Sequence, residues 1–404
     1  MMRRTSPQRV VAVFAVVVAI FAASGCGTPR PAGDPAAGLQ PGWNALGEVP
    51  WSADLFDQNA FWTGEELIVA GGYDHTDETR VTFATSTYAF SLKSMQWQEL
   101  APLSVPGYDG VINATGAWVG SSWVGLGFPC RSGPTPDLLA EENCDPNPVG
   151  LRWTTEAGWT AVLDAVPKAA VAPDRTVYLS LIGVSGSTVM LSALGGMLTI
   201  DSGLADPAAW TFTPWPAALG VVYPRAACLV GGQILVLTTD LPPELADQPF
   251  GVAQNVTVSV LSPDGLTPRG SQDFGERLEQ PTTQCLPDRA LLFHTSQGEI
   301  APIQRVTPEG ATPWVGRTTG PGRANTDGID VGTGLFEGSP LGATYTEQVK
   351  GEATQLAPIS FTELNLWTGE TLMVVTQASN QLMALLPAPS WEASSGYPFP
   401  EPVR

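Results

Sequence analysis

The residues that could carry chemistry in this chain are few: two histidines and five cysteines, set among many carboxylates. His75 lies in a polar segment that we expect to be a solvated loop, and His294 ends an apolar strand. A zinc site needs several His or Cys ligands, and a nucleophilic triad needs a serine and an acid beside a histidine. The sequence shows neither pattern. We expect no metal and no cofactor, and no reaction can be assigned from these residues.

The cysteine nearest the N-terminus, Cys26, follows a secretory signal. Three arginines precede the apolar run 10–23, and small residues lead directly to Cys26. The run is shorter than the ~20 residues that a membrane-spanning helix needs. The small residues and the cysteine resemble the lipobox of bacterial lipoproteins, with Ala23 where leucine is common. This resemblance implies cleavage before Cys26 and lipidation of its thiol; the alternative is an ordinary signal peptide with an incidental cysteine.

The other four cysteines form an even set, which in an exported chain indicates disulfides. We expect Cys130 to pair with Cys144 and to close a proline-rich loop. Cys228 and Cys285 lie at matching places in successive repeats, so we expect them to form the second disulfide. Four unpaired or regulatory thiols are the alternative.

Acidic residues dominate the charge but identify no site. The formal net charge is −20 at pH 7, and such a surface repels phosphate backbones, so we expect no nucleic-acid partner. The plainest interpretation of the charge is solubility. Segment 323–330 is superficially similar to a calcium loop but lacks the full ligand spacing and the terminal glutamate. Segment 262–267 is faintly similar to the Asp-box of sialidases, which is itself a structural hairpin.

One unit recurs along the chain: a strand, a tight polar turn and an apolar strand. Its copies lie at 59–72, 117–125, 181–191, 229–237, 285–294, 331–336 and 364–375. The turns recur at a mean spacing of about 51 residues. A second hairpin follows most copies, so each unit holds four short strands. No long stretch has a 3.6-residue apolar period, and we expect almost no helix after the signal.

Four-stranded units at this period predict an all-β fold, a β-propeller, whose radial closure protects the sheet edges. We expect seven blades, with six as the alternative. The strings 62–72 (WTGEELIVAGG) and 367–375 (WTGETLMVV), with Tyr88 and Trp97, resemble a Kelch-type blade of the galactose oxidase/Kelch-like group. The resemblance implies that the glycine doublet makes a sharp turn and that the tryptophan packs between blades. Some Kelch-type propellers are copper oxidases, but two scattered histidines do not suit a copper centre.

The sequence also predicts how the chain is divided. Residues 1–25 are the expected signal peptide, 26–42 a lipidated cysteine with a flexible Pro/Gly linker, and 43–404 the propeller. Within the propeller, 42–50 looks like a fourth strand without three before it. We expect it to complete the last sheet; a C-terminal strand near Trp391 is the alternative.

Two long polar insertions, 128–150 and 240–253, interrupt the propeller sequence. Long loops on a rigid scaffold often carry function, although a packing role is an equal alternative.

These observations favour a non-enzymatic binding or scaffold protein, held by a lipid anchor on the outer face of a bacterial membrane. The expected partner is a protein, peptide or glycan, and the expected state is a monomer. One alternative is an extracytoplasmic carbohydrate-active hydrolase or lyase that uses acidic residues at the channel mouth, with raised carboxyl pKa values. Another is a purely structural subunit of an envelope complex. The sequence assigns no catalytic or binding residue.

Overall fold

The computed structural model describes most of the chain between Leu39 and Leu386. The described residues are 39, 42–52, 55–77, 80–134, 143–167, 179–193, 195–203, 206, 208–219, 226–240, 252–274, 277–285, 289–296, 299–300, 304–313, 322–323, 329–336, 339–347, 356–358, 362–367, 372–376 and 381–386. The predicted lipidation site Cys26, most of the linker 26–42 and Trp391 lie outside them.

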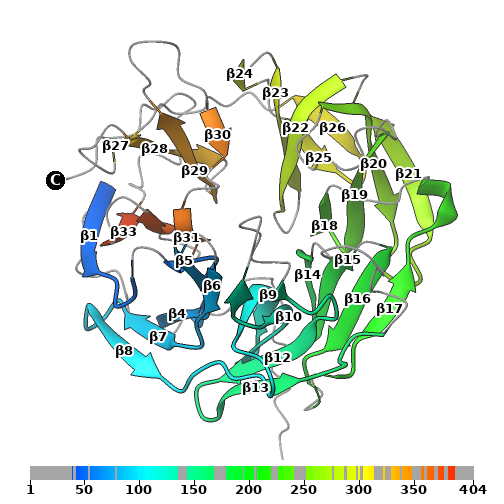
Figure 1. Cartoon of the computed structure of the whole chain (residues 1–404). Coiled ribbons are helices and arrows are strands. Elements are labelled where there is room, and N and C mark those ends of the chain that lie inside the picture. The colour runs from blue at the N-terminus through cyan, green and yellow to red at the C-terminus, as the bar shows by residue number, and fades with distance from the viewer. Residues whose placement is uncertain are drawn as a thin grey trace, which may run out of the picture.

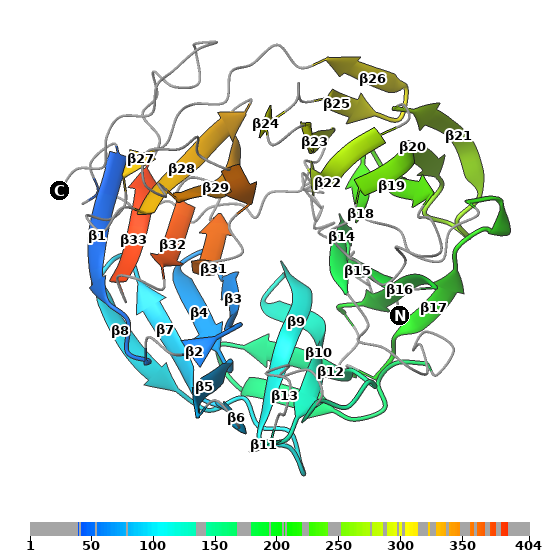
Figure 2. The same ribbon diagram turned by 45° about the horizontal axis from the view of Figure 1, so that its top comes forward.

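Antiparallel four-stranded sheets follow one another around a central axis, as Figures 1 and 2 show. The described residues contain no α-helix and one short 3₁₀ helix, Ala217–Leu219. The chain is therefore an all-β protein with a β-propeller fold, which confirms the predicted fold class. The expected number of seven blades stays a prediction.

The first three blades along the chain are named here after their first strands. The β3 blade consists of β3 (Asn59–Trp62), β4 (Glu66–Ala70), β7 (Thr87–Ser91) and β8 (Gln96–Leu100). The β9 blade consists of β9 (Gly110–Val119), β10 (Ser122–Cys130), β12 (Val149–Thr154) and β13 (Gly158–Val162). The β14 blade consists of β14 (Ser180–Ser185), β15 (Thr188–Ala193), β16 (Gly196–Asp201) and β17 (Thr211–Pro214).

The next two blades are joined into one sheet. The β18 blade consists of β18 (Ala226–Val230), β19 (Gln233–Asp240), β20 (Val252–Leu261) and β21 (Pro268–Asp273). The β22 blade consists of β22 (Arg277–Cys285), β23 (Ala290–Ser296), β25 (Gln304–Thr307) and β26 (Gly310–Pro313), with β24 (Glu299–Ile300) beside β23. The start of β20 pairs with β22 across the gap between the blades.

Two further sheets complete the ring. One consists of β27 (Gly322–Arg323), β28 (Ile329–Phe336), β29 (Ser339–Glu347) and β30 (Leu356–Pro358). The other, the closing blade, consists of β31 (Thr362–Trp367), β32 (Leu372–Thr376), β33 (Gln381–Leu386) and β1 (Gly42–Glu48). Because β1 pairs antiparallel with β33, the N-terminal strand closes the ring, as predicted.

Six of the seven repeats found in the sequence are antiparallel hairpins of a first and a second strand. The repeat expected at 331–336 is wrong in its register: these residues lie within the single strand β28, and the hairpin turn to β29 follows Phe336. The predicted turn glycines Gly64, Gly120, Gly186 and Gly231 all have positive φ. Glycine adopts this conformation without steric cost, which explains its recurrence at that point of the repeat. The turn at Ser262–Thr267 is the hairpin between β20 and β21, closed by the Ser262 N–H donating to the Thr267 carbonyl at 2.9 Å.

The second strand of the β3 blade is buried on both faces, which is why its residues 67–70 are all apolar. In β4, Leu67 and Val69 pack toward the closing blade, whereas Ile68 and Ala70 pack toward the β9 blade. All four are at most 1% exposed. Successive side chains of a strand point to opposite faces, so each blade contributes to two interfaces.

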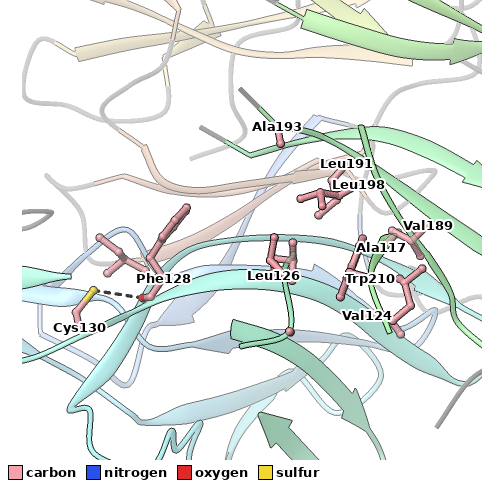
Figure 3. Close-up of a cluster of buried hydrophobic side chains, with 14 of the residues drawn as sticks. Ala117, Val124, Leu126, Phe128, Cys130, Val189, Leu191, Ala193, Leu198 and Trp210 are labelled. Carbon is pink, nitrogen blue, oxygen red and sulfur yellow. Dashed lines mark hydrogen bonds between the residues drawn. The ribbon is translucent and has the colours of Figure 1, made fainter. Parts of the chain in front are cut away.

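Aromatic side chains fill these interfaces. Trp118, Trp123, Trp153 and Trp159 are paired in register across the four strands of the β9 blade. The centre of the Phe61 ring, in the β3 blade, lies within 6.2 Å of the centre of each of these four tryptophan rings. Trp97 packs in the interface with the closing blade, which confirms its expected place between blades. The next cluster, which includes the interface between β10 and β15–β16, is mainly aliphatic, with Phe83, Phe128 and Trp210 as its buried aromatic residues (Figure 3).

Candidate functional site

The two ends of the propeller differ. At one end each first strand begins and each second strand ends: Gly110, the start of β9, pairs with Cys130, the end of β10. Segments that lead into first strands and connections that follow second strands therefore share this end, which we call the loop face. The tight hairpin turns, such as Gly120–Ser121, lie at the opposite end, which we call the turn face.

Both predicted insertions belong to the loop face. Segment 128–150 follows β10, and segment 240–253 follows β19, each of which is a second strand. Residues 135–142 and 241–251 of these insertions lie outside the described residues. The described end of the second insertion, Val252–Gln254, is not loop but the start of β20, where it pairs with β22.

An additional sheet of short strands covers part of the loop face. It consists of β2 (Leu55–Phe56), β5 (Tyr73–Asp77), β6 (Arg80–Phe83) and β11 (Gly133–Pro134), in the order β11–β6–β5–β2 (Figure 2). The β5–β6 hairpin follows β4, whereas β11 follows β10, so this accessory sheet connects two neighbouring blades. Val81 and Phe83 of β6 pack in one buried cluster with Phe128 of β10.

The accessory sheet corrects one expectation. His75 lies within strand β5 and not in a solvated loop. The polar segment Tyr73–Asp77 forms a strand because β2 and β6 pair with its backbone on either side. His294 lies in β23, within the β22 blade, as expected for a sheet residue. The two histidines are thus in different sheets, His75 in the accessory sheet and His294 in the β22 blade.

A disulfide holds the loop that follows β10. Cys130 is bonded to Cys144, as predicted, and the two residues also form a β-bridge. The backbone on either side is paired: the Arg131 N–H donates to the Asn143 carbonyl, and the Asp145 N–H donates to the Pro129 carbonyl, both at 2.9 Å. Because the buried Cys130 is part of the core, the disulfide ties the base of this stapled loop to the β9 blade.

A polar cluster, formed by Tyr108, Asp109, Arg131, Asp145 and Asn147, lies at the stapled loop. The Tyr108 hydroxyl donates to Asp145 Oδ2 at 2.7 Å. The backbone N–H and side-chain Nδ2 of Asn147 donate to Asp145 Oδ1 at 2.9 and 2.8 Å. Asp109 Oδ2 accepts the Ser132 N–H at 2.7 Å. Each of these carboxylates therefore fixes a piece of backbone or an aromatic ring.

The hydrogen bonds set the ionisation of the cluster. Partial burial on its own would raise the pKa of Asp145, but the hydrogen bonds from Asn147 and Tyr108 stabilise the carboxylate and lower that pKa below its usual value. Donation to the same carboxylate raises the pKa of Tyr108, because it stabilises the neutral phenol. At neutral pH the pair is a neutral phenol and a carboxylate, the state that keeps the hydrogen bond.

Arg131 is held in one orientation above this pair. Its guanidinium carbon lies 4.6 Å from the centre of the Tyr108 ring, a cation–π arrangement. Its Nε donates to the Gly107 carbonyl at 3.0 Å. Arg131 is nevertheless exposed, as are Asn147 and the neighbouring Gly107. The polar cluster is thus a hydrogen-bonded, partly exposed surface of mixed charge.

The second predicted disulfide, Cys228–Cys285, is present and joins β18 to β22, near the turn face. The core of the calcium-like segment, 324–328, lies outside the described residues. Within the part of the chain that the structure describes, no three His, Cys, Asp or Glu residues are grouped to hold a metal ion. None of those residues forms an apolar helix long enough to cross a bilayer.

The sequence predicts the insertion 128–150, but it does not predict that Tyr108 and Asp109 contact this insertion. Tyr108 and Asp109 precede β9, outside the predicted insertion 128–150, and meet it only in the fold. A usable signal was present: Pro106-Gly107-Tyr108-Asp109-Gly110 is a turn-rich segment directly before a first strand. Such segments share the loop face with the insertions.

No protein-family model matches this chain, and no curated protein matches it. Solved structures with a similar fold include a chain of the "Crystal Structure of Mitotic Checkpoint Complex", at 9% identity and a TM-score of 0.44, covering 96% of this chain and 99% of that one. Another is the Myceliophteria thermophila Cps50 (Swd1) β-propeller domain, at 10% identity and a TM-score of 0.44, covering 84% and 98%. A third, "Structure of YjhT", has 10% identity and a TM-score of 0.38 and covers 63% and 82%. Likeness at this level says nothing about ligand or activity.

Proposed function

We propose that this chain is a lipid-anchored, extracytoplasmic β-propeller that binds a protein, peptide or glycan partner through its loop face. The signal and the lipobox-like Cys26 support the location. The ring is proposed to have seven blades of Kelch type, since the repeats and the glycine and tryptophan positions of the β3 blade fit that pattern. The body is proposed to act as a monomer.

One observation carries the binding proposal: the loop face is built up by an extra sheet and a stapled loop, whereas most of the turn-face connections that the structure describes are short hairpin turns. The accessory sheet, the disulfide and the polar cluster add ordered surface there that the propeller ring itself does not need. Ordering a loop before it meets its partner lowers the entropic cost of binding. The exposed Arg131 and Asn147 supply polar contacts on that surface.

The hydrolase alternative stays a prediction, without an observation that favours it. A proton-donating carboxyl needs a raised pKa, whereas hydrogen bonds lower the pKa of Asp145 and of Asp201. For Asp145 these bonds come from Asn147 and Tyr108, and for Asp201 from Ser187 and the Gly203 N–H.

The proposal is tested by comparing loop-face and turn-face variants of the full chain. Arg131→Ala removes the exposed cation of the loop face. Lys93→Ala is the matched control, because Lys93 is an exposed cation in the turn between β7 and β8, at the turn face. Partners captured by cross-linking from envelope fractions, and glycans bound on an array, are compared among wild type and both variants.

We expect Arg131→Ala to weaken capture about tenfold, which corresponds to about 1.4 kcal/mol. Lys93→Ala should leave it unchanged. Equal capture by both variants, or loss on Lys93→Ala alone, would place the binding surface elsewhere.

A further inference from the structure

The chain enters the propeller ring through β1, and the direction of β1 shows at which face the N-terminal linker is attached. β1 is the outermost strand of the closing blade, at the rim of the ring (Figures 1 and 2). Gly42 pairs with Leu386 and Glu48 with Gln381. β33 is the third strand of its blade and therefore runs from the loop face to the turn face, so antiparallel β1 runs from the turn face to the loop face.

The segment that follows β1 confirms this direction. After Glu48 the chain passes through β2, which belongs to the accessory sheet at the loop face, and enters β3 there. Gly42, the end to which the linker is attached, consequently lies at the turn face. The chain thus joins the ring at the end opposite both insertions and the polar cluster.

We infer that the anchored protein presents its loop face away from the membrane, toward a partner that does not lie in the same bilayer. This inference rests on the proposed function, since it takes Cys26 as the attachment point. The fitting partner is a protein or glycan in the aqueous space beyond the body, and a lipid surface or a neighbouring membrane-embedded segment does not fit.

Dimensions support the orientation. The second strands have five to nine residues, as β4 and β10 do, and span about 17–30 Å, which gives the approximate depth of the ring. Leu39 is buried and packs in one cluster with residues of the closing blade, so the tether is the stretch from Cys26 to about residue 38. A random coil of that length would have a root-mean-square span of about 20 Å. This span is comparable with the depth of the ring, so on average the turn face should lie nearer the bilayer. Removal of the signal with its three arginines would change the net charge from −20 to −23 (16 − 39), which adds repulsion from anionic lipid.

Energy transfer to vesicles tests the inference. The acylated full chain is placed in phosphatidylcholine vesicles that contain a headgroup-labelled acceptor lipid. A donor dye is attached at position 80 or at position 93 through a clickable residue. Arg80 and Lys93 are exposed cations at opposite faces: Arg80 lies in the accessory sheet at the loop face, and Lys93 lies in the hairpin turn between β7 and β8 at the turn face.

We expect transfer from position 93 to exceed transfer from position 80 at least twofold. Repeating the linker residues 27–41 once should reduce this ratio, because a longer tether lets the body turn. If the protein stays on the vesicles but energy transfer is equal at the two positions, or higher at position 80, the inferred orientation is wrong and the lipid anchor is not affected. Protein that leaves the vesicles, or that behaves like Cys26→Ser, would overturn the anchor and the inference with it.

Discussion

The side chain of Asn59 joins two blades through the backbone at Ala114: its Oδ1 accepts the Ala114 N–H at 2.7 Å. Its Nδ2 donates to the Val111 and Ala70 carbonyls, each at 3.2 Å. The β9–β10 ladder shifts register at this point, so strand pairing does not satisfy these backbone groups of β9. One buried carboxamide therefore replaces ladder bonds that the irregularity removes.

Asn59→Leu should lower the free energy of unfolding by about 2–3 kcal/mol, because buried backbone groups of β9 lose their partner. Denaturant unfolding followed by tryptophan fluorescence measures the change. Gln98→Ala, an exposed change on β8, should stay within about 0.5 kcal/mol. A loss of equal size in both variants would contradict a specific role for the Asn59 bridge.

Phe61→Ala should cost about 3–5 kcal/mol, since it leaves a cavity among four tryptophan rings. The tryptophans would also lose fixed packing, so near-ultraviolet circular dichroism should weaken while the far-ultraviolet strand signal persists. Leu163→Ala serves as the control, because Leu163 is 42% exposed. An unchanged near-ultraviolet spectrum for Phe61→Ala would show that the row of tryptophans does not depend on it.

Leu46→Ala should weaken ring closure. Leu46 is the buried residue of β1 that packs with Leu382 and Met373 of the closing blade, and truncation should cost about 2–3 kcal/mol. Glu48→Ala, on the same strand and exposed, is the control. Hydrogen exchange should show faster exchange along β33 in the Leu46 variant. Exchange that rises equally in both variants would argue that β1 contributes by backbone pairing alone.

The two disulfides should differ in what their removal does. Cys228 and Cys285 are 57 residues apart, and Cys130 and Cys144 are 14 apart. In the chain-entropy account the longer loop stabilises by about 4 kcal/mol and the shorter by about 3. Replacing Cys228 and Cys285 together by serine should lower the melting temperature of the whole body. Replacing Cys130 and Cys144 should mainly speed proteolysis of the stapled loop; equal proteolysis in both double variants would refute this division.

The Tyr108–Asp145 pair should make the loop sensitive to acid. The folded pKa of Asp145 is lowered, so its contribution is present above the unfolded value of about 4 and is lost as pH falls through the folded pKa. The group is only partly buried, and solvent screens it, so the contribution is below about 1 kcal/mol. Wild type and Asp145→Asn should differ in stability at pH 7 and converge at low pH. A constant difference down to pH 2 would exclude Asp145 as the cause.

The ring could be predicted from the sequence because its signals are local. A strand, a glycine turn and an apolar strand lie within about fifteen residues, so each hairpin is visible without its neighbours. The two disulfides followed from even cysteine count and from matching places in the repeats. Closure by residues 42–50 followed from a strand pattern that lacked companions.

The loop face could not be predicted to the same extent, because its contacts join distant segments. Segment Tyr73–Asp77 is polar and has no strand pattern of its own; β2 and β6 make it a strand by pairing. Tyr108 and Asp145 are 37 residues apart, and they meet because the disulfide fixes the path of the loop. Such contacts depend on the completed scaffold and not on local composition.

Closure by β1 also fixes the order in which the chain can finish folding. Of the strands that the structure describes, the first to emerge during synthesis or export pairs with the last, since Gly42 meets Leu386. Until Gln381–Leu386 arrives, β1 has no sheet to join, and the closing of so long a loop is slow. Completion of the ring therefore waits for nearly the whole chain, and a nascent chain cut short before β33 would leave β1 as an unpaired strand.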